Sequence, residues 1–378
     1  SRGEHEVLTL LAQRLSDKEI AERKIPVVAP KGFLEHAVSE NIIAGGAMNR
    51  RGAFQFGAYL PKGPTDQVNS GIGMAVSPGT MSLIPPNLEI ERTGQTLELD
   101  GVKMVFQFTP GTEAPAEMNF LLPDLRVLCM AENANATMHN VLTPRGALVR
   151  DAKAWADYLT EALRLYGDRT QVMVTSHAWP RFGNDRVRDF IASHRDAYKY
   201  LHDQTVRLMN MGLTGEEIAD RIALPETLAA KWYNRGYYGT MRHNSRAVYQ
   251  RYMGWYEGNP AGLDNQPKEQ SAPRYVALMG GAKNVRKAAE KAMAAGDYRW
   301  AGELLDLAVF AGDETAKPLL AEAHRQMAYQ AESAIWRNMY LTAARELTDG
   351  VTPSPPVGQG VDFISATPTA TLLDLLAV

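Results

Sequence analysis

Cysteine is almost absent from this sequence. The single residue, Cys129, has no partner for a disulfide within the chain, so cysteine pairing does not indicate the compartment. Cys129 lies in the apolar run RVLCMA, which is typical of a small buried side chain. A run of about 18 apolar residues, the length that a membrane-spanning helix needs, is also absent. These absences exclude a disulfide scaffold and a membrane span within the 378 residues.

A strong charge of either sign is missing as well. The formal net charge is -3 at pH 7, and 22% of the residues are charged. Domains that bind nucleic acid usually carry a clustered basic face, so this balance does not indicate a nucleic-acid partner. The hydrophobic fraction of 45% and the mean hydropathy of -0.28 are typical of a globular protein. A chain of 378 residues is long enough for two or more domains.

The residue pattern changes from strand-like to helical near residue 188. Residues 88–108 predict a strand, a turn and two further strands, with turns at Thr93-Gly94 and Asp100-Gly101. A helix is predicted around residues 152–167. From about residue 184 helical periodicity dominates, and a capping-box pattern opens the helix after residue 213. Residues 289–332 resemble a tetratricopeptide helix hairpin, which needs a neighbour or a partner to bury its apolar face.

Three candidate metal ligands follow apolar, strand-like runs. Glu113 comes after VKMVFQFTPGT, Glu132 after LRVLCMA and His177 after QVMVTS. Layered α/β folds usually place their sites at such strand ends, and zinc takes carboxylate and imidazole ligands. Taken alone, each residue has an ordinary alternative as a loop glutamate or a hydrogen-bonded loop histidine. Two zinc ions need about six protein ligands, yet the HxHxDH motif that would complete such a site does not occur in the sequence.

Seven sequence runs carry a family resemblance. In chain order they are GFLEHAVSEN (32–41), GTEAPAEM (111–118), AEN with HN and PRGA downstream (131–147), HDQT (202–205), NRGYYG (234–239), GWYEGNPA (254–261) and LMGGA (278–282). In this order they resemble the alkyl sulfatases of the metallo-β-lactamase superfamily. In that family the HxHxDH motif lies shortly before the first run, and a sterol-carrier-protein-like domain closes the chain. We therefore expect this chain to be an internal part of a longer enzyme.

The resemblance implies roles for the candidate ligands. Glu113 would complete a first zinc site, Glu132 would bridge two zinc ions and His177 would complete the second site. The absent motif would supply the remaining ligands. Three further histidines lie in the matching runs but lack a metal-like partner nearby in sequence, and they stay outside the zinc assignment: His36, His139 and His243.

Two residues match the family's sulfate-binding positions. They are Asn140 and Arg145, both in the run HNVLTPRGA. An arginine suits a tetrahedral oxyanion because its fork donates two parallel hydrogen bonds. Their ordinary alternatives are a turn cap for Asn140 and a surface position after a proline turn for Arg145. The aromatic residues of NRGYYG either line the entrance to the site or pack the domains together.

The implied fold class is α/β with three parts. Residues 1–188 would form part of a metallo-β-lactamase αββα sandwich, and residues 189–350 an all-α dimerisation domain. Residues 351–378, which open with a segment rich in proline and glycine, would form a linker and the start of a sterol-carrier-protein-like α+β domain. The family further implies two Zn²⁺ per full-length subunit, a homodimer, and a periplasmic or secreted location by analogy with bacterial relatives.

The implied activity is zinc-dependent hydrolysis of alkyl sulfate esters, such as dodecyl sulfate, to an alcohol and inorganic sulfate. A different class of function is a metal-free dimerising or lipid-associated scaffold, because the HxHxDH motif is absent from this chain. A third is another hydrolase of the same superfamily. The paired glutamates, together with Asn140 and Arg145, argue against this third alternative.

Overall fold

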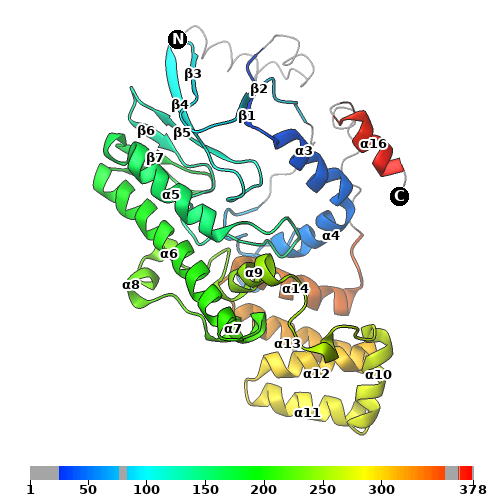
Figure 1. Ribbon diagram of the computed structural model, residues 1–378. Helices are drawn as coiled ribbons and strands as arrows, with labels where there is room; N and C mark the ends of the chain where they lie inside the picture. Colours follow the sequence, from blue (N-terminus) through cyan, green and yellow to red (C-terminus); the bar gives the residue numbers. More distant parts are fainter. Residues whose placement is uncertain (1–24, 76–82, 354–364, 366, 377–378) are drawn as a thin grey trace.

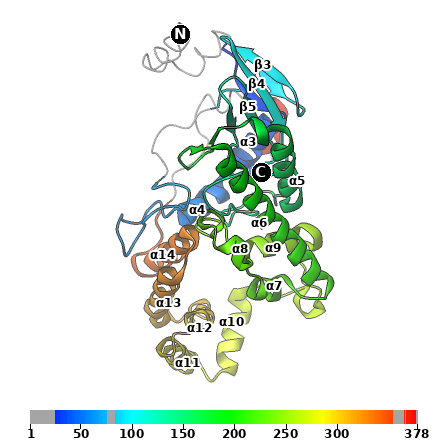
Figure 2. The ribbon, with the colours of Figure 1, turned by 90° about the vertical axis from the view of Figure 1, so that its left-hand side faces the viewer.

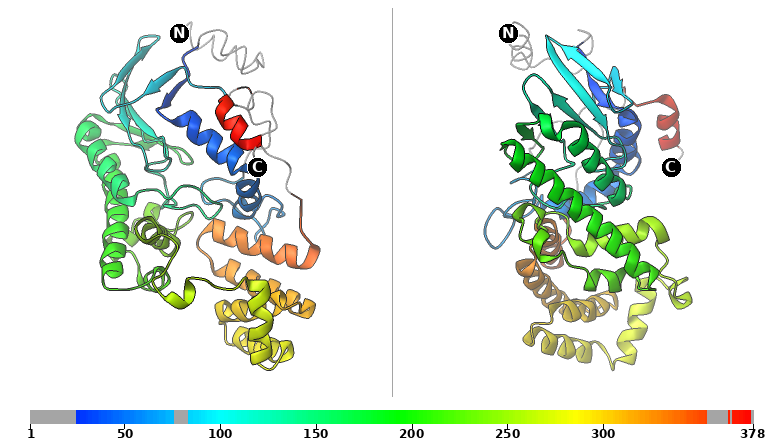
Figure 3. Two further views of the ribbon diagram at one scale, coloured as in Figure 1. Left: turned by 45° about the vertical axis from the view of Figure 1, so that its right-hand side comes forward. Right: turned by 60° about the vertical axis from the view of Figure 1, so that its left-hand side comes forward.

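A sheet region and a helical region lie end to end in the structure (Figure 1). The structure is a computed structural model that describes residues 25–75, 83–353, 365 and 367–376. Figure 2 and Figure 3 show the same two regions from other directions, with the strands at one end and α10 to α13 at the other. The predicted class, a mixed α/β fold followed by helices, is confirmed.

Six strands form the main sheet, in the order β3-β4-β5-β6-β7-β8. Their bounds are β3 Thr96–Leu99, β4 Val102–Phe108, β5 Met118–Leu122, β6 Val127–Cys129, β7 Val172–Val174 and β8 Arg181–Phe182. Neighbouring strands are antiparallel except for β6 and β7, which are parallel and are joined through helix α5 (Ala152–Tyr166). A second sheet consists of the parallel pair β1 (Val28–Pro30) and β2 (Leu88–Ile90).

The layers follow the order helix, sheet, sheet, helix. Figure 1 shows α5 on one side of the main sheet and the β1–β2 pair on the other, with α3 (Phe33–Val38) beyond that pair. This is the partial αββα sandwich that the family resemblance implies.

The predicted strands over residues 88–108 are present, but they divide between the two sheets. The turn at Thr93-Gly94 carries the chain from β2 in the small sheet to β3 in the main sheet. The second turn closes a β3–β4 hairpin, in which Asp100 and Gly101 both have positive φ, 49° and 76°. Two successive residues of positive φ are what a two-residue hairpin turn of type I′ requires.

The other regular elements of the described residues are helices. They are α4 Gly45–Phe56, α6 Asn184–Asn210, α7 Gly215–Arg221, α8 Glu226–Ala229, α9 Met241–Met253, α10 Lys268–Leu278, α11 Ala282–Ala294, α12 Tyr298–Phe310, α13 Lys317–Gln330, α14 Ala334–Asp349 and α16 Thr369–Leu376; short π and 3₁₀ segments are η1 Ser39–Ile43, η2 Gly167–Arg169, η3 Trp232–Asn234, η4 Pro260–Gly262 and η5 Glu314–Ala316. The capping box at Thr214 and Glu217 is confirmed at the start of α7. None of the helices in the described ranges is long and apolar enough to cross a membrane.

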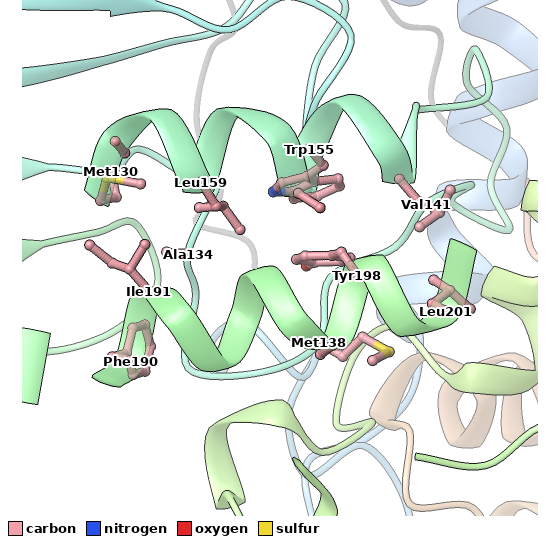
Figure 4. Close-up of a cluster of buried hydrophobic side chains, with 14 of the residues drawn as sticks. Met130, Ala134, Met138, Val141, Trp155, Leu159, Phe190, Ile191, Tyr198 and Leu201 are labelled. Carbon is pink, nitrogen blue, oxygen red and sulfur yellow. The ribbon is translucent and has the colours of Figure 1, made fainter. Parts of the chain in front are cut away.

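The main hydrophobic core joins the sheet to α5 and α6. Trp155 of α5 stacks on Tyr198 of α6, with ring centroids 4.4 Å apart, and Leu159 packs beside them (Figure 4). The same core continues into α7 and α9 as far as Tyr249. The predicted boundary at residue 188 falls inside α6 and inside this core, so the division at 188 stays a prediction.

The last two long helices return to the sheet region. Helix α14 packs against α13 and against α4, where Glu346 pairs with Arg50 at 2.5 Å and Asn338 donates to the Gln55 carbonyl at 3.3 Å. A separate core of alanine, valine and leucine side chains holds α10 to α13 together. Most of the predicted linker, residues 354–364, lies outside the described residues.

Candidate metal and anion site

The three predicted metal ligands lie at one edge of the main sheet. Glu113 follows β4, Glu132 follows β6 and His177 follows β7. Because β4, β6 and β7 run in the same direction, their C-terminal ends lie at the same edge. The His177 Nε2 atom is 2.5 Å from the Glu132 Oε1 atom.

The backbone is strained at two of these strand ends. Ala131 and His177 both have positive φ, 45° and 67°. Such a conformation costs a non-glycine residue about 1 to 2 kcal/mol. Hydrogen bonds hold it in place, since the Ala131 carbonyl accepts from the Ser176 amide at 2.9 Å and from the Thr175 hydroxyl at 2.7 Å. At these two strand ends the side chains of Glu132 and His177 come into contact.

Arg150 and His139 support the carboxylates, and the sequence analysis assigned neither to the site. Arg150 is buried and donates to Glu113 Oε1 at 2.5 Å and to the Asn140 carbonyl at 2.6 Å. Its Nη1 also lies 3.1 Å from His139 Nδ1. The signal that could have indicated Arg150 is its place directly before Asp151, the N-cap of α5.

Two neighbours of His139 Nδ1 bear on its tautomer. Arg150 Nη1, which can only donate, lies 3.1 Å away, and the Asn140 carbonyl oxygen, which can only accept, lies 3.3 Å away. The shorter contact favours Nδ1 as the acceptor, with the ring proton on Nε2. Nε2 lies 3.4 Å from Glu132 Oε1 and 3.7 Å from Glu113 Oε1. With the proton on Nε2, His139 donates toward the carboxylates and orients them.

The ionisable groups at this edge of the sheet change one another's pKa values. Burial raises the pKa of Glu132, but hydrogen bonds with His139 and His177 lower it more, so the carboxylate stays ionised. The hydrogen bond with Glu132 raises the pKa of His177. Burial, with the nearby charge of Glu113, raises the pKa of Glu117 to about 8. Glu117 is thus protonated at neutral pH and adds no third negative charge.

A cavity of about 470 Å³ opens beside the carboxylates. Its lining residues are His36, Ser39, Glu40, Ala44, Met48, Glu113, Ala114, Pro115, Glu132, Arg145, Ala147, Leu148 and Arg150. Arg145, predicted to bind sulfate, therefore lies in the same cavity as Glu113 and Glu132. Its guanidinium forms an ion pair with Glu40, and its backbone amide donates to Gln55 Oε1 at 2.9 Å.

Asn140, the other predicted sulfate-binding residue, is fully buried and does not line the cavity. Its side-chain oxygen lies 2.7 Å from His243 Nε2, and its carbonyl accepts from Arg150. The structure therefore places Asn140 behind the cavity wall, in contact with the group that holds Glu113.

The NRGYYG run packs the helical region against the site loop. Tyr238 is buried, with its ring 4.9 Å from that of His139 and its hydroxyl accepting from Gln55 at 3.2 Å. Gly239 donates to the Met138 carbonyl at 2.8 Å, and a Cβ there would lie 2.2 Å from the His139 carbonyl oxygen. Only glycine allows this approach. Of the two interpretations of this run, packing is the one that its buried contacts support.

The donor set fits zinc. Glu113, Glu132 and His139 have ligand atoms within 4.8 Å of one another in the described part of the chain. His139 acts as a donor, but His177 touches Glu132 and offers a second imidazole. Carboxylate and imidazole are donor types that zinc takes.

Comparisons with known proteins identify the relatives of this chain. Residues 214–350 match the family described as alkyl sulfatase dimerisation. An (R)-specific secondary-alkylsulfatase of Pseudomonas sp. is 47% identical over 368 residues, which cover 96% of this chain and 55% of the relative. A linear primary-alkylsulfatase of Pseudomonas sp. is 44% identical and covers 96% and 54%. An alkyl/aryl-sulfatase of Saccharomyces cerevisiae is 43% identical and covers 89% and 52%.

The same relationship is seen in three dimensions. The solved structure of the stereoselective inverting sec-alkylsulfatase Pisa1 from Pseudomonas sp. has a TM-score of 0.92 at 47% identity, covering 96% of this chain and 58% of that one. The resemblance read from the sequence runs is confirmed. The chain spans about half the length of the curated relatives it matches.

Proposed function

The chain belongs to the alkyl sulfatase family, and on that premise we propose that the whole protein hydrolyses alkyl sulfate esters to an alcohol and inorganic sulfate. The observation that carries this proposal is the shared cavity, which Arg145 lines together with Glu113 and Glu132. A guanidinium in the same cavity as two carboxylates that can bind a metal suits a sulfate ester, because the guanidinium can donate hydrogen bonds to the sulfate oxygens. Detergent-like chains such as dodecyl sulfate are the proposed substrates.

We further propose that Glu113, Glu132 and His177 hold part of a centre of two Zn²⁺, with the other ligands outside this chain. When bound, zinc supplies Lewis-acid charge and activates water as a nucleophile at neutral pH. Arg150 holds the Glu113 carboxylate in place through its 2.5 Å hydrogen bond. His139 does the same for Glu132, by donating from Nε2.

Arg145 would bind the sulfate group. Its guanidinium is partly exposed in the cavity, so it can donate to an oxyanion if it gives up its ion pair with Glu40. The matching of Asn140 to a sulfate-binding position rests on the resemblance, and its burial argues for an indirect role.

The proposed assembly is a homodimer. The match of residues 214–350 to an alkyl sulfatase dimerisation family supports it. Large apolar side chains on α10 are exposed, with 84% exposure for Leu278 and 56% for Tyr275, as expected for a face that a second subunit covers.

The experiment that tests the function is zinc content by elemental analysis together with sulfate release from dodecyl sulfate. Both would be measured on this chain and on the product of its complete reading frame. We expect two zinc ions and activity in the longer form. A longer form without metal would refute the zinc hydrolase and favour the metal-free scaffold.

Two variants of the longer form test the residues. Glu132→Ala should lower both zinc content and rate, whereas Arg145→Ala should retain zinc and lose most activity. The exposed neighbours Glu91→Ala and Arg92→Ala serve as matched controls and should change neither. Normal zinc in Glu132→Ala would reject its role as a ligand, and unchanged turnover in Arg145→Ala would remove it from the sulfate site.

A further inference from the structure

A line of hydrogen bonds connects α14 of the helical region to Glu113. The indole Nε1 of Trp336 lies 3.0 Å from His243 Nδ1. His243 Nε2 lies 2.7 Å from the Asn140 side-chain oxygen. The Asn140 carbonyl then accepts from Arg150, which donates to Glu113. These residues come from α14, α9 and the loops after β6 and β4, and they are far apart in sequence.

The donors and acceptors in this line have only one consistent arrangement. An indole N–H can only donate, so His243 Nδ1 must accept and Nε2 must carry the ring proton. Burial lowers the pKa of His243 to about 3, so the ring is neutral at ordinary pH. The Nε2 proton then points at Asn140, and the atom that receives it must be the amide oxygen. The Thr240 hydroxyl, 3.1 Å from the same Nδ1 atom, can donate to it as well. Trp336 and Thr240 thus determine the tautomer of His243, and His243 the amide orientation of Asn140.

His243 holds the Asn140 side chain, and Asn244 holds the backbone on either side of it. Asn244 clamps the same loop, donating to the His139 carbonyl at 2.8 Å and accepting from the Val141 amide at 2.8 Å. The Asn140 carbonyl is therefore a fixed acceptor at which Arg150 is anchored at 2.6 Å. An arginine with one end anchored presents the other end to Glu113 in a defined position.

We propose that Trp336 and His243 are positioning residues, which orient Asn140 and, through its carbonyl and Arg150, the carboxylate of Glu113. The inference rests on the proposed function, in which Glu113 is a zinc ligand. Its consequence is that α14, inside the match to the dimerisation family, sets the geometry of the metal site in its own subunit. Zinc affinity then depends in part on the indole N–H of Trp336, which is not one of the proposed zinc ligands.

The test uses Trp336→Phe in the full-length protein, because phenylalanine keeps an aromatic ring and removes the N–H. We expect zinc affinity, measured by competition with a chelating dye, to fall about three- to tenfold, with an unchanged dimer on light scattering. His243→Leu should act in the same direction and more strongly. His243→Gln should restore affinity, since its amide offers one acceptor and one donor in place of the two ring nitrogens. Trp300→Phe, the same change at a half-exposed site on α12, is the matched control and should have no effect.

A double-mutant cycle separates this inference from a general loss of packing. In an Asn140→Ala background, Trp336→Phe should have no further effect on zinc affinity, because the link has already been removed. An unchanged affinity in Trp336→Phe, or an equal loss in both backgrounds, would overturn the inference. The same cycle on the urea unfolding of the metal-free protein keeps the two proposals apart. If the two substitutions are coupled in the unfolding free energy but the protein binds no zinc, only the proposed zinc centre is refuted. If they are not coupled, the positioning role of Trp336 is refuted.

Discussion

The ion pair between Arg145 and Glu40 affects how the cavity binds an anion. Arg145, the proposed sulfate-binding residue, is neutralised by Glu40, and its backbone is held by the buried Gln55. Arg150, by contrast, is already hydrogen-bonded to Glu113 and is not free to bind an anion. The anion affinity of the site therefore depends on how easily Arg145 exchanges its partner.

Glu40→Gln tests this exchange at the residue scale. Removing the carboxylate frees the Arg145 guanidinium and removes a negative charge from the cavity, so sulfate should bind more tightly. We expect a gain of about two- to fivefold, in keeping with a partly exposed ion pair worth up to about 1 kcal/mol. Isothermal titration with sodium sulfate would measure it. Glu91→Gln, which removes an exposed partner of Lys31, is the control, and weaker binding in Glu40→Gln would show that Glu40 assists the site.

At the scale of elements, the start of α5 connects helix stability to the site. The N-cap residue Asp151 accepts from the backbone amides of Lys153 and Ala154 at 2.9 and 3.0 Å. It also pairs with Arg251 at 2.8 Å, and it directly follows Arg150. The cap thus fixes the point from which Arg150 reaches Glu113.

Asp151→Ala should lower the free energy of unfolding by about 1 to 2 kcal/mol, because two amides at the start of α5 lose their acceptor. Asp151→Asn should retain most of that stability, since its side-chain oxygen still caps the helix. Urea denaturation of the two variants would measure the difference. Equal losses in both would show that the pairing with Arg251, and not the cap, supplies the stability.

At the scale of the whole molecule, a buried histidine makes stability depend on pH. Burial lowers the pKa of His194 to about 4, whereas an unfolded histidine titrates near 6.5. Between these values the unfolded chain binds a proton that the folded chain does not bind. Stability should therefore fall as the pH decreases from about 6.5 to about 4.

His194→Phe keeps the ring between Phe190 and Tyr233 and removes the titrating group. The decrease in unfolding free energy between pH 6.5 and pH 5 should be smaller in this variant than in the parent protein. Urea denaturation at the two pH values would measure the slopes. Parallel slopes would mean that other groups account for the acid sensitivity.

The proposed dimer is the second prediction at this scale. Leu278→Glu places a charge on the exposed face of α10, where the side chain has little to lose in a monomer. If a second subunit covers this face, burying that charge is unfavourable and the variant should be a monomer on light scattering. Lys283→Glu on the neighbouring α11 is a charge-changing control. A stable Leu278→Glu dimer would place the interface on another face.

Local features of the fold could be predicted from the sequence because they depend on neighbouring residues. The Asp100-Gly101 turn, the Thr214 capping box and the helix at 152–166 all follow from conformational preference and periodicity over a few positions. The placement of Glu113, Glu132 and His177 at strand ends follows in the same way. The family resemblance contributed their proposed roles.

The sequence by itself thus determined the elements and the kinds of chemistry at their ends. Only the tertiary structure decided the partners: Arg150 for Glu113, Glu40 for Arg145, and Trp336 for His243, 93 positions away. It also decided that Asn140 is buried and that His139 is a donor to the carboxylates. The physical reason is that propensity acts over a few residues, whereas hydrogen-bond partners and tautomers depend on how distant elements pack.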